Sequence, residues 1–221
     1  SKSTWQPLLM LSGLYDQTGQ VERAYQSVGK ALEFAPDNPE VLLAAGYLAA
    51  KLNRIDDSLQ RLRKLLTGKR DDGFKAQGRS VLLQLGQHSG QPAMVLEALS
   101  GEVAGTSSEE CVVLRAAAQG QLGEAQAQYD TLEAGCASHP KDYAIRFALA
   151  DFLGERGYDN EALNTLGAAL DNPEAPAETY KRLSLLLAKL GRAEDANNAV
   201  QLYAQLVDKR AQREIALPLA G

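Results

Sequence analysis

The chain has 221 residues, of which 45% are hydrophobic and 23% charged, so it can bury a core and is not a disordered segment. Its formal net charge of −5 argues against nonspecific binding to nucleic acid, which depends on neutralising phosphates. No apolar run is long enough to span a bilayer, so we expect this segment not to be membrane-spanning.

A pattern of small and large residues recurs at a period near 34 residues, which is the distance from Gly19 to Asn53. Each copy has a turn residue, a small residue five positions later and a large apolar residue four positions after that. The turn residues are Gly19, Asn53, Gly120, Gly157 and Gly191. The small residues are Ala24, Ser58, Ala125, Ala162 and Ala196, and the large ones are Val28, Leu62, Tyr129, Leu166 and Val200. Such a period is the signature of a helical solenoid.

The first repeat is predicted over residues 5–38 and the second over 39–68. In the first, one apolar helix face over 5–17 is followed by Gly19 and by an antiparallel partner helix over 21–34. Asn38 is suited to cap the next helix, with Pro39 at its first position and Glu40 near its positive end. The second repeat follows the same pattern and has a basic second helix.

The third repeat, over 73–100, is the least regular, because Met94 or Val95 stands where a small residue is expected. The segment from Ser107 to Glu110 matches a capping box and begins the fourth repeat, over 107–139. Gly120 is expected to turn the chain there, before Ala125, Tyr129 and Leu132. The fifth and sixth repeats are predicted over 141–173 and 177–210, followed by a tail over 211–221.

The repeats resemble tetratricopeptide repeats. The first repeat supplies the family pattern with Leu8, Leu11, Ser12, Tyr15, Ala24, Val28, Ala31 and Pro36. The second supplies Leu42, Ala45, Gly46, Ala49, Ser58, Leu62 and Leu65, and lacks the terminal proline. The resemblance implies an all-α fold, a single right-handed superhelical solenoid of about six antiparallel helix pairs. We call the first helix of each repeat the A helix and the second the B helix.

In this family the A helices line a concave groove that binds partners. The matching positions here are Gln6, Leu9, Gly13, Asp16, Glu40, Leu43, Tyr47, Ala50, Glu110, Leu114, Ala117, Phe147, Asp151, Glu178, Lys181 and Leu185. From these, the candidate groove residues are Leu9, Leu43, Tyr47, Glu110, Leu114, Phe147, Asp151 and Lys181. The clamp with which chaperone-binding members hold a C-terminal carboxylate is absent, because Leu9 and Gly13 occupy its positions. The mixture of apolar and acidic groups suits a helix or an extended apolar segment of another protein or peptide.

A second candidate surface is the basic segment over 51–79, which carries nine basic residues against four acidic ones. Arg61, Lys64 and Arg70 are its candidate docking residues for an acidic partner. The alternative is an ordinary solvated helix face.

No catalytic residue, cofactor or metal site is predicted. Only His88 and His139 are present, neither with a recognisable nucleophile, and Cys111, Cys136 and His139 lack a fourth metal ligand. In the repeat geometry, Cys111 lies early in an A helix and Cys136 just past the end of the following B helix. A disulfide between them would stabilise the fold by about 3 kcal/mol and imply an oxidising compartment. Two reduced, partly buried thiols are the alternative.

These features predict a non-catalytic scaffold for protein–protein interaction. The setting that we favour is a bacterial envelope assembly for exopolysaccharide export and biofilm formation, in the periplasm; the alternative compartment is the cytoplasm. Two other functions stay open: a ligand- or peptide-sensing repeat domain of a regulator, and a structural arm of an enzyme whose catalytic domain is elsewhere. Because no polar capping helix is evident, we expect flanking repeats or domains, with a self-associating end face as the alternative.

Overall fold

A computed structural model describes residues 4–69, 73–101, 103–170 and 175–216, with side chains described as far as residue 209. Within these residues the chain forms twelve α-helices and no strand, so the all-α prediction is confirmed. The helices are α1 (Trp5–Gln17), α2 (Val21–Phe34), α3 (Pro39–Lys51), α4 (Ile55–Thr67), α5 (Phe74–His88), α6 (Pro92–Ala98), α7 (Ser108–Gln121), α8 (Ala125–Ser138), α9 (Tyr143–Glu155), α10 (Asp159–Gly167), α11 (Ala177–Lys189) and α12 (Ala193–Ala216).

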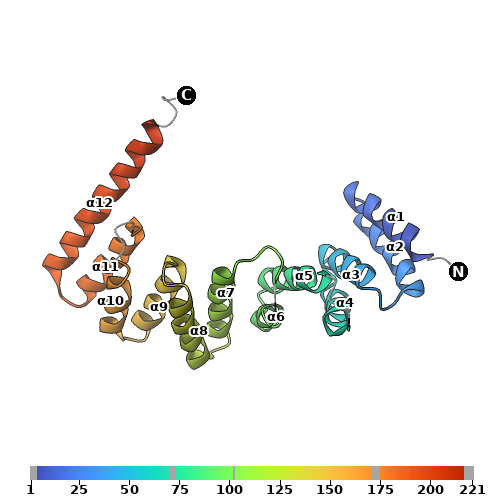
Figure 1. The fold of residues 1–221 in the computed structure, drawn as a ribbon, viewed down its shortest axis with the longest axis horizontal. Helices are drawn as coiled ribbons and strands as arrows, with labels where there is room; N and C mark the ends of the chain where they lie inside the picture. The colour runs from blue at the N-terminus through green and yellow to red at the C-terminus, as the bar shows by residue number, and fades with distance from the viewer. Residues whose placement is uncertain (1–3, 70–72, 102, 171–174, 217–221) are drawn as a thin grey trace. The chain divides into compact units, whose positions relative to one another are not determined.

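The chain divides into two compact units, residues 1–124 and 125–221. In the first unit α1 pairs with α2, α3 with α4 and α5 with α6, and in the second α9 pairs with α10 and α11 with α12 (Figure 1). Each later A helix also packs on the B helix before it: α3 on α2, α5 on α4, α7 on α6, α9 on α8 and α11 on α10. The boundary between the units lies between α7 and α8, inside the predicted fourth repeat.

Side-chain caps begin the A helices α3, α7 and α9, and the cap of α9 is Asp142, which accepts a hydrogen bond from the N–H of Ile145 at 2.8 Å. The side chain of Asn38 accepts hydrogen bonds from the backbone N–H groups of Glu40 (3.0 Å) and Val41 (3.2 Å), which confirms the predicted cap of α3. Ser107 caps α7 in the same way, through the N–H of Glu110 at 3.2 Å. These bonds satisfy amide groups that have no partner inside the helix.

The A and B helices approach most closely at the small residues. Ala24 and Ala162 are fully buried, as the repeat pattern predicts. In the second repeat, a Cβ added to Gly46 would lie 2.8 Å from Cδ2 of Leu62, so the backbone of α3 rests directly on that leucine. Any larger residue at position 46 would force the pair apart.

The predicted register of the fourth repeat is wrong by three residues. Gly120 lies inside α7, and the left-handed turn residue is Gly123, with φ 76°. The large buried residue nine positions beyond the turn is then Leu132, whereas Ala125 is exposed and Tyr129 is only partly buried. Either glycine can end a helix. A turn at Gly120 would place Tyr129 at the buried position, where its hydroxyl group would lose water, whereas a turn at Gly123 places Leu132 there.

The third repeat keeps close packing although α6 is short. Met94 and Val95 are both buried, and a Cβ on Gly86 of α5 would lie 2.9 Å from Cβ of Met94 and 3.0 Å from the backbone nitrogen of Val95. The small residue of this repeat has therefore moved from the B helix to the A helix.

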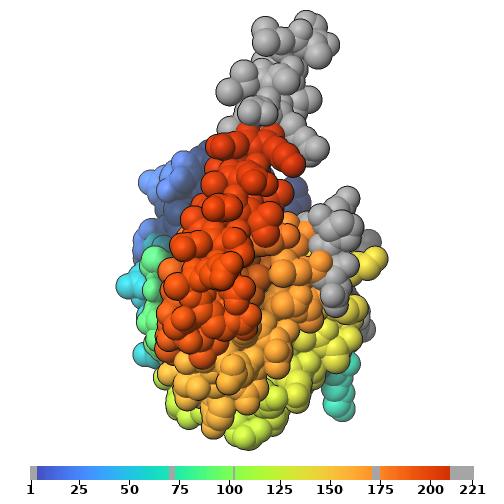
Figure 2. Space-filling model, turned by 90° about the vertical axis from the view of Figure 1, so that its left-hand side faces the viewer, coloured from blue at the N-terminus to red at the C-terminus, as the bar shows by residue number. Residues whose placement is uncertain are grey.

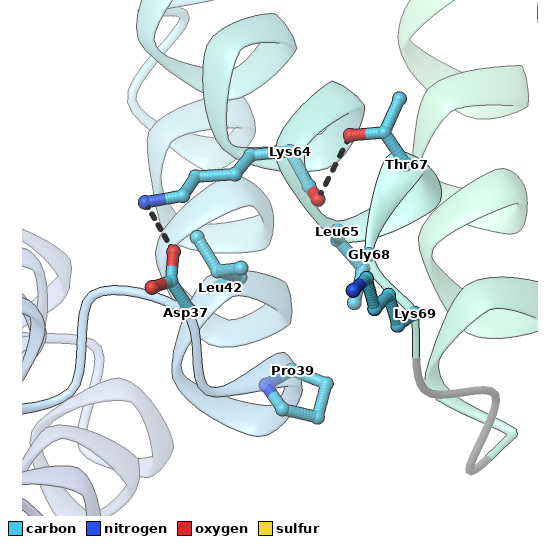
Figure 3. Close-up of a pocket in the computed structure, with 8 residues that line it drawn as sticks. All are labelled: Asp37, Pro39, Leu42, Lys64, Leu65, Thr67, Gly68 and Lys69. Atoms are coloured by element: carbon cyan, nitrogen blue, oxygen red, sulfur yellow. Dashed lines mark hydrogen bonds and ion pairs between the residues drawn. The ribbon is translucent and has the colours of Figure 1, made fainter.

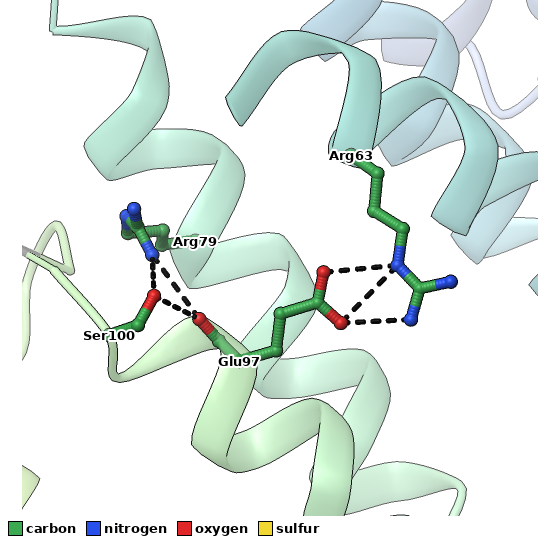
Figure 4. A network of polar contacts seen from close by, with 4 residues as sticks. All are labelled: Arg63, Arg79, Glu97 and Ser100. Atoms are coloured by element: carbon green, nitrogen blue, oxygen red, sulfur yellow. Dashed lines mark hydrogen bonds and ion pairs between the residues drawn. The ribbon is translucent and has the colours of Figure 1, made fainter. Parts of the chain in front are cut away.

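Arginine side chains hold the C-terminal end of α6 (Figure 4). Nη1 of Arg79, from α5, donates to the carbonyl oxygen of Glu97 at 3.2 Å and to Oγ of Ser100 at 2.7 Å. Arg63 of α4 donates to both carboxylate oxygens of Glu97, at 2.9 Å from Nη2 and 3.0 Å from Nε. Positive charge at a helix C-terminus is favourable, because the last carbonyl groups carry partial negative charge.

Candidate functional site

The A helices of the first unit line an open cleft of about 480 Å³, which we call the first cleft. Six of its residues are groove positions expected from the repeat pattern: Leu9, Gly13, Asp16, Glu40, Leu43 and Tyr47. The structure therefore brings together the candidate residues Leu9, Leu43 and Tyr47. Its size is within the range of ligand-binding pockets.

The third A helix completes the first cleft. Phe74, Gln77 and Val81 of α5 line it opposite the residues of α1 and α3. Sequence reasoning omitted them because the register of the third repeat was open. The sequence does show an apolar run, Val81-Leu82-Leu83, in the predicted helix. Which side chain of this run faces the cleft depends on how α5 packs on α4, so the run alone could not identify Val81.

The two ends of the first cleft differ in charge. At one end, Nζ of Lys51 donates to Asp16 at 2.6 Å and lies 5.2 Å from the ring centroid of Tyr47. The hydrogen bond to Asp16 raises the pKa of Lys51, so the ammonium group of Lys51 stays charged beside that carboxylate. At the other end, the exposed side chain of Glu40 forms no ion pair with any residue that the structure describes. The cleft thus offers apolar walls and one carboxylate.

A second cleft of about 530 Å³ lies between α9 and α11, and Asp151, Glu178, Lys181 and Leu185 of the expected groove line it. Arg182, which sequence reasoning missed, organises this surface. Its guanidinium group pairs with Asp151 and with Glu178, the latter at 3.1 Å, and lies 4.8 Å from the ring centroid of Phe147. Asp151 and Phe147 are therefore held by a neighbouring A helix. Lys181 lies 3.6 Å from Glu178 and is more exposed than Arg182.

Glu110 and Leu114 line neither cleft. Glu110 is exposed in the first turn of α7, and Leu114 is partly buried against the apolar cluster that contains Leu82 and Leu99. Leu114 therefore contributes to the core of the first unit, and its role in binding a partner stays a prediction.

No family model and no curated protein matches the chain. Solved structures do match it. PilW, a type IV pilus biogenesis factor, is 17% identical over 92% of this chain and 94% of its own, with a TM-score of 0.50. The pilF protein of Pseudomonas aeruginosa is 14% identical over 97% of both chains, with a TM-score of 0.50. MamA of MSR-1 is 15% identical over 78% of this chain and 98% of its own, with a TM-score of 0.52.

The chain has the tetratricopeptide repeat fold. The helices of the first two repeats carry the expected repeat residues at their contacts, and the likeness to solved structures extends over most of the chain. At these levels of identity the likeness concerns the fold, so the use to which the repeats are put has to be argued from the clefts themselves.

Within the described residues, four of the nine basic residues in the basic segment form ion pairs with acidic residues of neighbouring repeats. Nζ of Lys64 lies 2.8 Å from Oδ1 of Asp37, beside a cleft of about 500 Å³ formed by the ends of α3 and α4 (Figure 3). Arg61 is partly buried on α4, and Arg70 lies outside the described residues. Elsewhere in the segment Arg54 pairs with Glu22 at 2.8 Å and Arg63 pairs with Glu97. These cations therefore join consecutive repeats, which leaves less charge for an acidic partner.

Of the two alternatives for the cysteines, this structure has free thiols at Cys111 and Cys136, and a disulfide between them stays a prediction. Cys111 packs against the apolar cluster of the first unit, whereas Cys136 belongs to α8 of the second. Burial raises the pKa of both thiols. Among the described residues, no group of three or more His, Cys, Asp or Glu side chains is placed to hold a metal ion, and none of the described helices is long and apolar enough to cross a membrane.

Proposed function

We propose that this tetratricopeptide array is a non-catalytic scaffold that docks another protein or peptide in its concave clefts, the first cleft above all. The observation that carries the proposal is the meeting of Leu9, Leu43, Tyr47, Phe74 and Val81, from three helices, around one open cavity. Tyr47 is 39% exposed, so its ring is available to a partner. Aromatic residues in apolar pockets are typical anchors of binding energy.

The chemistry of the first cleft favours one class of segment. Its walls accept a large aliphatic or aromatic side chain, and Glu40 at one end favours a lysine or arginine beside that side chain. Asp16 already forms an ion pair with Lys51, so we do not expect the ligand to place a second basic residue beside Asp16. The expected ligand is therefore a short helix or extended segment that pairs an apolar residue with a basic one.

Two glycines provide a sharp test. A Cβ at Gly13, in the first cleft, meets no atom within 4 Å, and the same is true of Gly29 in α2, which does not line that cleft. Gly13→Phe therefore adds a ring at the cleft from a position where its Cβ has room, and Gly29→Phe is the matched control. Both changes replace glycine inside a helix by a residue of higher helix propensity, so they should raise helix stability by a similar amount of about 0.5 kcal/mol or less.

The experiment selects peptides from a displayed random library on the wild-type protein and measures their affinities by fluorescence anisotropy. We expect Gly13→Phe to weaken binding at least tenfold and Gly29→Phe to leave it unchanged. Equal binding to all three proteins would exclude the first cleft. In that case Arg61→Glu combined with Lys64→Glu tests the basic segment as the docking surface.

The setting that we propose is a bacterial envelope assembly that exports exopolysaccharide, with the array in the periplasm. Support comes from the family resemblance, since tetratricopeptide arrays recruit enzymes and pores in such assemblies. The test is complementation: a strain that lacks the gene should lose exopolysaccharide export, and the wild-type gene but not Gly13→Phe should restore it. Normal export in the deletion strain would contradict this setting and leave docking in the first cleft intact.

A further inference from the structure

The last helix, α12, leaves uncovered a face that is buried in the other B helices. Val200 occupies the repeat position of Leu62 and is 50% exposed, whereas Leu62 is 0% exposed. Val28 and Leu166, at the same position of α2 and α10, are also buried. Figure 2 shows α12, in orange-red, with no other helix of its unit laid over its outer side.

The covered repeats show which kind of element packs on this face. A Cβ added to Gly78 of α5 would lie 2.7 Å from Cδ2 of Leu65 and 3.8 Å from Cδ2 of Leu62, so the next A helix rests directly on both leucines of α4. The corresponding residues of α12 are Tyr203 and Val200. The face is therefore shaped for an A helix.

The first helix, α1, has the matching uncovered face. Leu14 occupies the repeat position of Leu48, which is 3% exposed in the apolar cluster that joins α3 to α2; Leu14 itself is 58% exposed. Leu11, at the position of the fully buried Ala45, is also exposed. This face differs from the one that contributes Leu9 and Gly13 to the first cleft.

Both faces lack charge. No charged residue occurs from Trp5 to Tyr15 or from Ala196 to Val207. Of the twelve large hydrophobic side chains that are exposed within the described residues, α1 carries three, and α12 carries Val200 and Val207 one helical heptad apart; the third on α12, Leu202, lines a cleft against α10 and α11 instead. A helix with this much uncharged apolar surface is normally covered by another element, and the stretches of α1 and α12 that would meet carry no charged residue.

We propose that α12 of one copy binds α1 of a second copy, head to tail. The contact would continue the interface that joins α2 to α3, α4 to α5 and α10 to α11 inside the chain. The contact pairs two different faces, so a dimer still has a free α1 face on one copy and a free α12 face on the other. The assembly therefore grows by adding further copies, unless the rotation between copies closes it into a ring. This inference is independent of what binds in the first cleft.

The test is sedimentation velocity over a wide range of concentration, on the wild-type protein, Leu14→Glu and Val200→Glu. The mean mass of the wild type should rise with concentration, and each variant alone should remain monomeric. An equimolar mixture of the two variants should form a dimer and nothing larger, because one keeps an intact α12 face and the other an intact α1 face. A symmetric contact through either face alone would not show this rescue.

Leu185→Glu is the matched control. Leu185 is 65% exposed and apolar but lies in the second cleft, so its replacement should leave the association unchanged. Far-ultraviolet circular dichroism checks that every variant keeps its helices, which is expected because the changed side chains are exposed. A wild-type protein that is monomeric at all concentrations, or a mixture without dimer, would overturn the proposal and assign both faces to helices from outside this sequence.

Discussion

Oγ of Ser58 donates a hydrogen bond of 2.8 Å to the carbonyl oxygen of Gly46, across the closest approach of α3 and α4. The first repeat has the same bond in the opposite direction: Ser12 of α1 donates to the carbonyl oxygen of Ala24 in α2 at 2.9 Å. Both serines are buried. A hydroxyl group on one helix and a small residue on the other therefore let the backbones touch while every polar group in the contact is satisfied.

The contrast between two A-helix glycines tests this packing. Gly46→Ala should lower the free energy of unfolding by about 1–3 kcal/mol, because the new Cβ meets a fully buried leucine that has no room to move. Gly13→Ala should raise it by up to about 1 kcal/mol, because glycine is a poor helix former and the space beside Gly13 is open. Urea unfolding followed by circular dichroism measures both. Similar effects of the two changes would contradict the close approach of α3 and α4.

The corrected register of the fourth repeat makes a second prediction. Leu132→Ala should cost about 2–5 kcal/mol, because Leu132 is 1% exposed. Ala125→Leu should change the stability by less than about 0.5 kcal/mol, because Ala125 is exposed. Thermal unfolding of both variants distinguishes the registers: a turn at Gly120 would make Ala125→Leu the damaging change.

The arginines at the end of α6 should contribute unequally. Arg79→Met removes charged hydrogen bonds to backbone groups and to Ser100, and should cost about 1.5–3 kcal/mol. Arg63→Met removes only an ion pair with Glu97 between partly exposed side chains, which should be worth about 0.2–1 kcal/mol. Denaturant titration gives both values. If Arg63→Met proved the more damaging, the end of α6 would depend on the ion pair instead.

The two thiols should react slowly in the folded protein. Burial raises the pKa of Cys111 and Cys136, so less thiolate is present at neutral pH, and the rate of reaction with a disulfide reagent should rise as the pH increases toward the raised pKa values. The unreduced protein, unfolded in guanidinium, should titrate as two free thiols. Unfolded protein without free thiols would instead establish the disulfide and support the periplasmic assignment.

Much of the candidate site could be predicted from the sequence. The A-helix positions are a few residues apart on one helix face, so Leu9, Leu43 and Tyr47 could be placed together once the period was known. The contribution of Phe74 and Val81 could not be predicted, because the third repeat lacks its small residue and the register depends on how Gly86 meets α6. Arg182 was missed for a related reason. It forms an ion pair with Asp151 of the preceding repeat, and the residue pattern of a single helix carries no information about a pairing between repeats.

The sequence by itself determined the period, the helix pairs, the caps at Asn38 and Ser107 and, outside the third and fourth repeats, the small residues at the helix contacts. All of these are local demands of backbone geometry and close packing. Only the tertiary structure decided which of two glycines turns the fourth repeat, because the choice depends on burying Leu132. It also decided that Arg63 and Lys64 of α4 form ion pairs with acidic residues of adjacent repeats and that α1 and α12 keep apolar faces exposed. Those outcomes depend on which helix lies beside which, and side chains far apart in sequence meet only after the repeats have stacked.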